Sequence, residues 1–307
     1  MWNDRVFRTL LLSAALICLV GLFRPDAMRT VSHEKWFWSW KTHSTHMHDI
    51  VVLGDSRVYR GVSPEAMTPL LTGYRIFNFG YSSGSLSPRM LSEAERRLDG
   101  QGRRILVLGV TPHALTPNAS RDAQYLQEAN RAASEVLENI YIAPLTKYFD
   151  PTTPIRFAKE FERKRRGARE EFHASGWVAA LREGSDPGEG LALYSGVFNG
   201  NRVSPELVDR LIRQTETWVL EGIRVYAFRP PTLPEMIELE RRISGFEENE
   251  FRKRFGQAGG IWIPVSPEGY RIYDGSHLDK ESAVRLSAYL AGIIRDHETR
   301  PGRAAAP

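Results

Sequence analysis

From residue 50 onward the chain alternates short apolar runs with helical stretches, and this alternation limits the fold more than any other feature. Helices are expected over residues 87–100, 204–222 and 280–297. Strands are expected in five apolar runs, at residues 50–53, 74–80, 103–110, 222–231 and 261–266. Strands separated by helices of this length predict an α/β fold with a doubly wound parallel sheet of about five strands.

Polar or flexible residues stand where three of these strands end. The first strand ends in Gly54, Asp55 and Ser56, the second in Gly80, and the third is followed by Thr111. Parallel sheets bind ligands beyond the carboxyl ends of their strands, so these residues are expected at one functional edge. Asp55 and Ser56 have a plainer reading as caps of the next helix, since both residue types satisfy free N–H groups there.

A serine nucleophile needs a base and a group that orients the base, and the segment "YDGSHLD" offers both. Asp274 and His277 are three residues apart, so a turn or the start of a helix brings them to one face. With Ser56 they predict a catalytic triad in the chain order Ser, Asp, His. A capping turn is the alternative for the second pair. The joint occurrence of both pairs around an α/β pattern favours catalysis.

These two distant blocks, with a glycine after the second strand, resemble the SGNH (GDSL-type) hydrolase superfamily over residues 50–297. The stretches "GDSRVYRGVSPE" and "FNFGYSSGS" are similar to bacterial membrane-anchored members, including alginate O-acetylation and teichoic acid D-alanine-transfer proteins. The resemblance implies a flavodoxin-like sheet order and an acyl-serine intermediate. It also implies an O-acylated envelope polysaccharide or a small ester as substrate, and a possible membrane acyltransferase partner.

The resemblance also assigns roles to single residues. Ser56 attacks the ester carbonyl, His277 moves the proton, and Asp274 orients the imidazole. The backbone N–H groups of Ser56 and Gly80 face the oxyanion. Where the family has an asparagine after the third strand, this chain has Thr111, whose hydroxyl is expected to donate instead. The departure leaves a rival reading open, an inactive accessory protein that binds glycan or a membrane acyltransferase.

Two arginines near the active edge are candidates for substrate binding. Arg57 follows the serine, with a solvent-exposed position as the plainer expectation, and Arg229 ends the fourth strand. No cofactor is predicted. The H-x-x-H-x-H pattern formed by His43, His46 and His48 matches no standard metal-ligand spacing, so no metal is predicted either.

The N-terminus departs from globular composition. Residues 9–23 carry no charge, so residues 1–24 predict an uncleaved signal anchor, with a cleaved signal peptide as the alternative. Residues 25–49 are expected to form a juxtamembrane connector whose aromatic residues either lie at a membrane interface or pack on the domain. Cys18 is the single cysteine, which is compatible with export. We therefore expect a single-pass protein of the bacterial inner membrane with a periplasmic domain.

The net charge and two further segments of the chain complete the expectations for function and domain limits. The net charge is +4, of which the first 24 residues supply half, so nucleic-acid binding is not expected. Residues 113–203 interrupt the alternation and predict a helical insertion, with helices near 121–139 and 155–173. Residues 298–307 predict a disordered tail.

Overall fold

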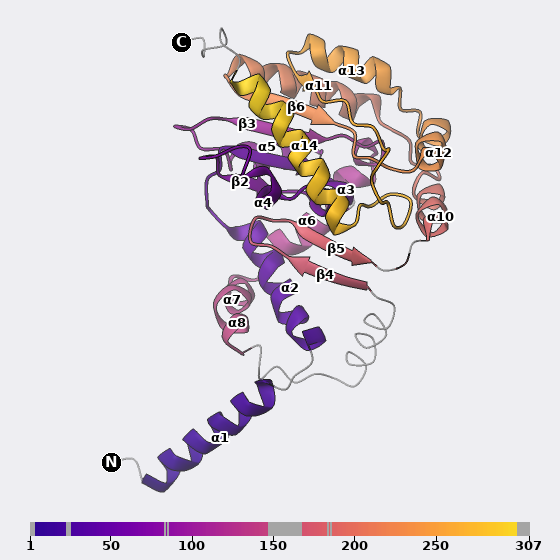
Figure 1. The fold of residues 1–307 in the computed structure, drawn as a ribbon. Helices are drawn as coiled ribbons and strands as arrows, with labels where there is room; N and C mark the ends of the chain where they lie inside the picture. Colours follow the sequence, from indigo (N-terminus) through magenta and orange to yellow (C-terminus); the bar gives the residue numbers. More distant parts are fainter. Residues whose placement is uncertain are drawn as a thin grey trace.

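A five-stranded parallel sheet forms the centre of the molecule (Figure 1). The computed structural model describes residues 4–22, 26–82, 84, 86–146, 168–182, 184 and 186–299. The strands lie in the order β2-β1-β3-β6-β7, and every neighbouring pair is parallel. They are β1 (Ile50–Gly54), β2 (Ile76–Asn78), β3 (Ile105–Gly109), β6 (Arg224–Phe228) and β7 (Ile261–Trp262). The predicted fold class is confirmed, and each predicted apolar run contains one of these strands.

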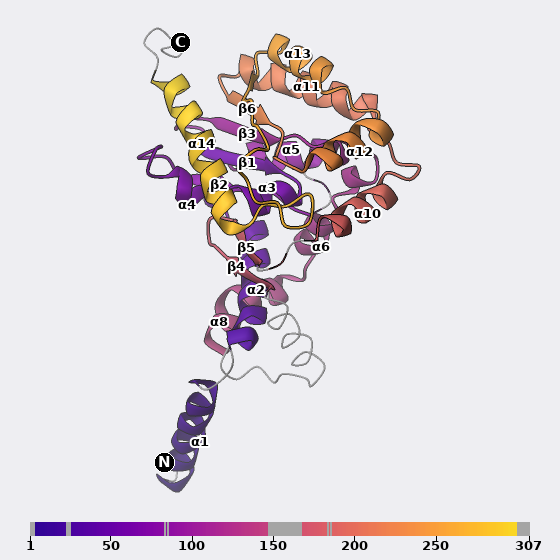
Figure 2. The ribbon, with the colours of Figure 1, turned by 45° about the vertical axis from the view of Figure 1, so that its right-hand side comes forward.

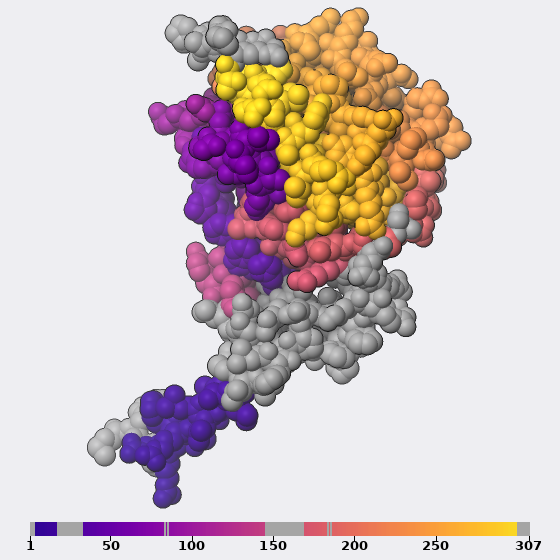
Figure 3. Space-filling model, viewed as in Figure 1, coloured from indigo at the N-terminus to yellow at the C-terminus, as the bar shows by residue number. Residues whose placement is uncertain are grey.

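Alternate residues of each strand build two separate cores, because successive side chains of a strand point to opposite faces. In β1, Val51 and Leu53 face one core, and Ile50 and Val52 face the other. The first core is covered by α5 (Pro88–Glu95), α11 (Pro205–Leu220) and α13 (Glu248–Gln257). The second is covered by α3 (Ser56–Gly61), α4 (Pro64–Met67) and α14 (Lys280–Glu298). Helix α14 crosses the face of the molecule that is turned to the viewer in Figure 3.

The helix starts predicted at Ser87 and Ser204 are confirmed, and the helix end predicted at Gly100 is not. Ser87 and Ser204 cap α5 and α11 with their hydroxyl oxygens, and a proline follows each. Helix α5 ends at Glu95, five residues before the predicted Gly100. The helix stops early because the following backbone pairs with the segment before β1, where the His48 N–H donates to the Arg97 carbonyl.

The insertion after β3 contains a strand pair as well as helices. It begins with two 3-10 turns, η1 (His113–Leu115) and η2 (Ala119–Arg121), and later elements include the π-helix η3 (Glu138–Ile142). In the described residues of the insertion, the α-helices are α6 (Ala123–Ala129), α7 (Ala133–Leu137), α8 (Ala143–Thr146) and α10 (Pro187–Val197), and the strands are β4 (Ala168–Phe172) and β5 (Val178–Arg182). Helix α12 (Pro234–Ser244) follows β6.

The antiparallel β4–β5 hairpin corrects part of the predicted helix over 155–173. Residues 168–172 form a strand, while residues 155–167 of that prediction lie outside the described residues. Pairing with β5 in the hairpin outweighs the helix-favouring local composition. The hairpin is held against α3, because the Trp177 indole N–H donates to the Arg60 carbonyl at 2.9 Å.

Two helices precede the sheet, α1 (Asp4–Leu22) and α2 (Asp26–His43). Figures 1 and 2 show α1 projecting from the domain. Within the described ranges, no helix combines the length and the apolarity that crossing a bilayer requires. The second half of α2 packs on the domain: Phe37 is fully buried, and the Trp38 ring meets the rings of Tyr59 and Tyr81. Of the two alternatives for the connector's aromatic residues, the structure shows packing on the domain for Phe37 and Trp38.

The three connector histidines have separate surroundings. His43 Nε2 lies 3.0 Å from the Glu128 carbonyl, and His48 stacks on Phe77 with ring centroids 4.6 Å apart. Burial of the His48 ring, with the nearby charges of His46 and Arg75, lowers its pKa to about 4. The part of the chain that the structure describes holds no cluster of three metal-ligating side chains.

Two glycines seat helix α3 directly on the sheet edge. A Cβ atom built on Gly54 or on Gly109 would lie 2.2 or 2.1 Å from Val58 Cγ2, well inside van der Waals contact. A Cβ on Gly80 would lie 2.9 Å from the backbone nitrogen of Tyr59. The absence of these three side chains therefore brings α3, whose first residue is Ser56, into contact with the ends of β1, β2 and β3.

We expect Gly109→Ala to lower the free energy of unfolding by more than about 2 kcal/mol, because the new methyl group overlaps Val58. Urea denaturation of the purified chain measures the effect. Gly100→Ala is the matched control, since a Cβ there meets no atom within 4 Å, and a change within about 0.5 kcal/mol is expected. Equal stability of the two variants would show that α3 does not depend on this close approach.

Candidate active site

The structure brings Ser56, His277 and Asp274 together in one hydrogen-bonded chain. His277 Nε2 lies 2.8 Å from Ser56 Oγ, although the residues are 221 positions apart in the sequence. The other ring nitrogen, His277 Nδ1, lies 2.7 Å from Asp274 Oδ2. Ser56 is the first residue of α3 and is partly exposed. This is the geometry that the Ser-His-Asp mechanism requires.

Asp274 is held as a carboxylate. Its Oδ1 accepts hydrogen bonds from the backbone N–H groups of Ser276 (3.0 Å) and His277 (2.8 Å), and its Oδ2 faces the imidazole. Burial alone raises the pKa of Asp274, but the imidazole and the two backbone donors outweigh it, and the net pKa lies well below the usual range. An ionised Asp274 is positioned to stabilise a proton on His277.

The insertion braces the loop that carries Asp274 and His277. The Gly190 N–H of α10 donates to the Asp274 carbonyl at 3.0 Å, and the Asp186 N–H donates to the Tyr273 carbonyl at 2.8 Å. A Cβ on Gly190 would lie 2.0 Å from the Asp274 carbonyl oxygen, so only glycine permits this approach. No local pattern in the insertion indicated that it supports the loop of Asp274 and His277.

Asp55 caps α3 and is itself held by Thr111. The Asp55 carboxylate accepts from the Arg57 N–H at 3.0 Å and from the Thr111 hydroxyl at 2.6 Å. Thr111 is fully buried, and its single hydroxyl proton is committed to Asp55. The predicted donation from Thr111 to an oxyanion is therefore wrong. The threonine instead holds Asp55, the N-cap residue of α3.

Gly80 reaches the predicted edge, but its N–H already has an acceptor in Asn78 Oδ1 at 3.0 Å. The Asn78 side-chain amide also donates to the carbonyls of Val58 (2.9 Å) and Val62 (2.7 Å), near the end of α3. One buried side chain thus joins Gly80 to the nucleophile helix. Sequence reasoning missed Asn78, although a polar residue within the apolar run "RIFNF" was a visible signal.

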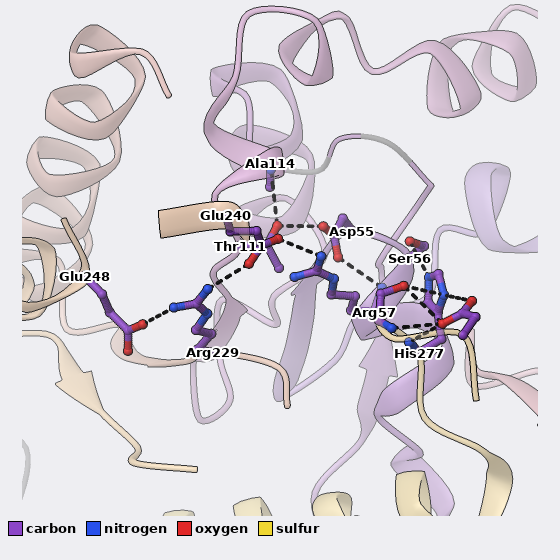
Figure 4. Close-up of polar contacts among 11 residues, drawn as sticks. Asp55, Ser56, Arg57, Thr111, Ala114, Arg229, Glu240, Glu248 and His277 are labelled. Atoms are coloured by element: carbon purple, nitrogen blue, oxygen red, sulfur yellow. Dashed lines mark hydrogen bonds and ion pairs between the residues drawn. The ribbon is translucent and has the colours of Figure 1, made fainter. Parts of the chain in front are cut away.

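The two arginines predicted to bind substrate form an ion-pair chain instead, in which Arg57 is buried and Arg229 is partly buried (Figure 4). Glu240 of α12 bridges them, with Oε1 2.7 Å from Arg57 Nη2 and Oε2 2.7 Å from Arg229 Nη2. Arg229 also pairs with Glu248. Figure 4 shows the Arg57 side chain directed toward Glu240 and away from His277. Arg57 is 2% exposed, so the expected solvent position is also wrong.

The charge balance explains why these arginines turn inward. Burial alone raises the pKa of Glu240, but the charges of Arg57 and Arg229 outweigh that effect and lower it, so the bridging carboxylate stays ionised. The Arg57 guanidinium also lies 4.6 Å from the ring centroid of Tyr194 on α10. Sequence reasoning missed Glu240, because nothing in its local pattern marks it as the partner of a residue 183 positions away.

Comparisons with known proteins add little to this geometry. No family model matches the chain, and no curated protein matches it significantly. A carbohydrate acetylesterase from Sinorhizobium meliloti, Est24, superposes with a TM-score of 0.35 and 14% sequence identity, covering 81% of this chain and 98% of that chain. A likeness this weak carries no functional inference, so the function rests on the site itself.

Proposed function

We propose that this chain is a serine-dependent enzyme of SGNH type that cleaves O-acyl esters through an acyl-serine intermediate. The observation that carries the proposal is the contact of 2.8 Å between Ser56 Oγ and His277 Nε2, with Asp274 on the far side of the imidazole. A capping role explains Asp55, whose carboxylate accepts from the first turn of α3. It does not explain the Ser56 hydroxyl, which contacts the imidazole.

The first half-reaction follows from these contacts. Ser56 Oγ bonds to the acyl carbon while its proton passes to His277 Nε2, and the carbonyl electron pair moves onto oxygen. The tetrahedral adduct collapses, the ester oxygen leaves with the proton from His277, and an acyl-serine remains. Water or a sugar hydroxyl then attacks the acyl carbon by the reverse sequence, which yields hydrolysis or transfer respectively.

The oxyanion of this adduct is assigned to backbone donors. The Ser56 N–H lies in the first turn of α3, where helix geometry provides no intrahelical partner. The Gly80 N–H is the second donor in this proposal, and it serves the oxyanion only by turning from Asn78 Oδ1, the acceptor that it has in the structure. A single oxyanion donor typically contributes about 2.7–4 kcal/mol to catalysis. With Thr111 committed to Asp55, we expect slower turnover than three donors would give.

The substrate class in this proposal is an O-acylated envelope polysaccharide or a related small ester, acted on with a membrane acyltransferase as partner. Its support is the resemblance of the stretches "GDSRVYRGVSPE" and "FNFGYSSGS" to membrane-anchored SGNH proteins. The rival is an accessory protein that binds glycan without catalysis. The engagement of Thr111 with Asp55 is the one observation that favours the rival, because it removes a donor from the site.

The test is turnover of an aryl acetate by the full chain and by Ser56→Ala. Loss of the nucleophile is expected to lower the rate at least about a thousandfold. Ser134→Ala, at an exposed serine of α7, is the matched control and should keep the full rate. Equal rates for the unaltered chain and Ser56→Ala would reject the enzyme and leave the accessory role.

We also propose that α1 attaches the domain to a membrane, in the setting of a bacterial inner membrane with the domain on the periplasmic side. The support is the exposure of Val6, Phe7, Leu10, Leu11, Leu12 and Leu16, of which Leu12 is 71% exposed. At about 100° per residue these positions are spread around the helix, so its apolar surface is not confined to one face. Figures 1 and 2 show the α1 ribbon projecting from the domain.

Flotation with phospholipid vesicles tests this attachment. The full chain is expected to float, and the triple variant Leu10→Ser, Leu11→Ser, Leu12→Ser to lose at least about a hundredfold in partitioning. Leu137→Ser is the control, since Leu137 is an equally exposed apolar residue on the domain. Flotation of the triple variant to the same extent as the unaltered chain would contradict a lipid role for α1.

A further inference from the structure

Lys41 of α2 is fully buried inside a cage of four aromatic rings. Its Nζ lies 5.4 Å from the centroid of Phe37, 5.5 Å from Trp38, 5.6 Å from Tyr59 and 5.1 Å from Tyr81. Each distance is within the range over which an aromatic face attracts an ammonium group. Two of the rings belong to α2 itself, whereas Tyr59 and Tyr81 come from elsewhere in the domain, so the lysine joins three segments.

The ammonium group also reaches a fourth segment. Lys41 Nζ donates to the Gly176 carbonyl in the turn of the β4–β5 hairpin at 2.7 Å. Gly176 has a φ of +88°, and a Cβ there would lie 2.0 Å from the Asn78 carbonyl oxygen. The neighbouring Ser175 carbonyl accepts from the Asn78 N–H at 2.8 Å. The turn that Lys41 holds is therefore pressed against the end of β2.

Two of the segments that Lys41 touches lead to the candidate active site within a few residues. Tyr59 lies on α3, three positions after Ser56, and Tyr81 directly follows Gly80. The Tyr81 hydroxyl lies 3.0 Å from Thr42 Oγ1, and the Tyr81 N–H donates to the Gly54 carbonyl at 3.1 Å. The cage is thus continuous with the backbone that presents both the nucleophile and the second oxyanion donor.

Stability alone does not account for a lysine at this position. Burial, and the nearby charge of Arg97, lower the pKa of Lys41 well below its ordinary value, so its charged form is disfavoured there. An apolar side chain of similar length fills such a cage without desolvating an amine, and replacing buried charge by well-packed apolar groups is often neutral or stabilising. What an apolar residue lacks is the N–H donor to the Gly176 carbonyl, which a lysine keeps in either protonation state.

We propose that Lys41 is a positioning residue that fixes α3 and the backbone after β2 relative to each other, and so sets the geometry between Ser56 and the Gly80 N–H. The catalytic part of this inference rests on the proposed function. Through Lys41, helix α2 contributes to the geometry of the site and is more than a spacer between α1 and the sheet.

The experiment compares the full chain with Lys41→Met, which keeps the length and removes the donor and the charge. Lys35→Met is the matched control, because Lys35 lies exposed on the same helix. Two readouts are taken: aryl acetate kinetics, and backbone hydrogen exchange of the peptides over residues 56–62 and 79–82. We expect Lys41→Met to lower kcat about tenfold or more with little change in KM. We also expect faster exchange in both peptides, with a Tm within a few degrees of the unaltered chain.

Hydrogen exchange separates this proposal from the catalytic one, because it needs no turnover. Unchanged hydrogen exchange in both peptides of Lys41→Met overturns the positioning role. So does an unchanged kcat of Lys41→Met when the control Lys35→Met also turns over normally. Faster exchange in a chain that turns over no ester supports the coupling by Lys41 and rejects the proposed function. A fall in kcat matched by a large loss of Tm would reject positioning in favour of a purely structural role. If Lys41→Met does not fold, Lys41→Gln is taken through the same measurements.

Discussion

The packing of Val58 against two glycines is the contact on which the candidate site depends. Gly54 and Gly109 end adjacent parallel strands in register with each other, and neither carries a side chain that would push α3 away. Ser56, two residues before Val58, is therefore presented just beyond the sheet, at the edge where parallel sheets place their ligands. The loop with Asp274 and His277 needs only to come over this edge for the hydroxyl to meet the imidazole.

A six-residue helix such as α3 has too few hydrogen bonds to be stable alone, so tertiary contacts must hold it. Those contacts come from elements outside the sheet. Arg57 pairs with Glu240 of α12, Tyr59 forms one wall of the cage around Lys41 of α2, and Arg60 pairs with Glu170 of the hairpin at 2.7 Å. The cations of α3 are thus each matched by a carboxylate from a different segment. The sheet sets where Ser56 lies, and these partners keep it there.

The parts of the structure that could be predicted are those encoded locally. Short apolar runs and Ser-Pro helix starts indicated the sheet and its helices, and the residue types of Ser56, Asp274 and His277 indicated a set whose members do meet. The roles given to Thr111 and Arg57 were wrong for one reason: a place at a strand end reveals the edge but not the direction of the side chain. That direction depends on partners 56 and 183 residues away, which no local pattern reveals. The cage around Lys41 was hidden in the same way, because its rings come from three segments.

The proposed mechanism requires an activated Ser56, and covalent labelling with a fluorophosphonate probe tests that activation most directly. The full chain is incubated with the probe, and the labelled peptide is located by mass spectrometry, beside a His277→Gln variant that removes the base. We expect one adduct on Ser56, and we expect the rate of its formation to be at least about a hundredfold lower in His277→Gln than in the unaltered chain. An unlabelled Ser56, or labelling at the same rate without the imidazole, would contradict it.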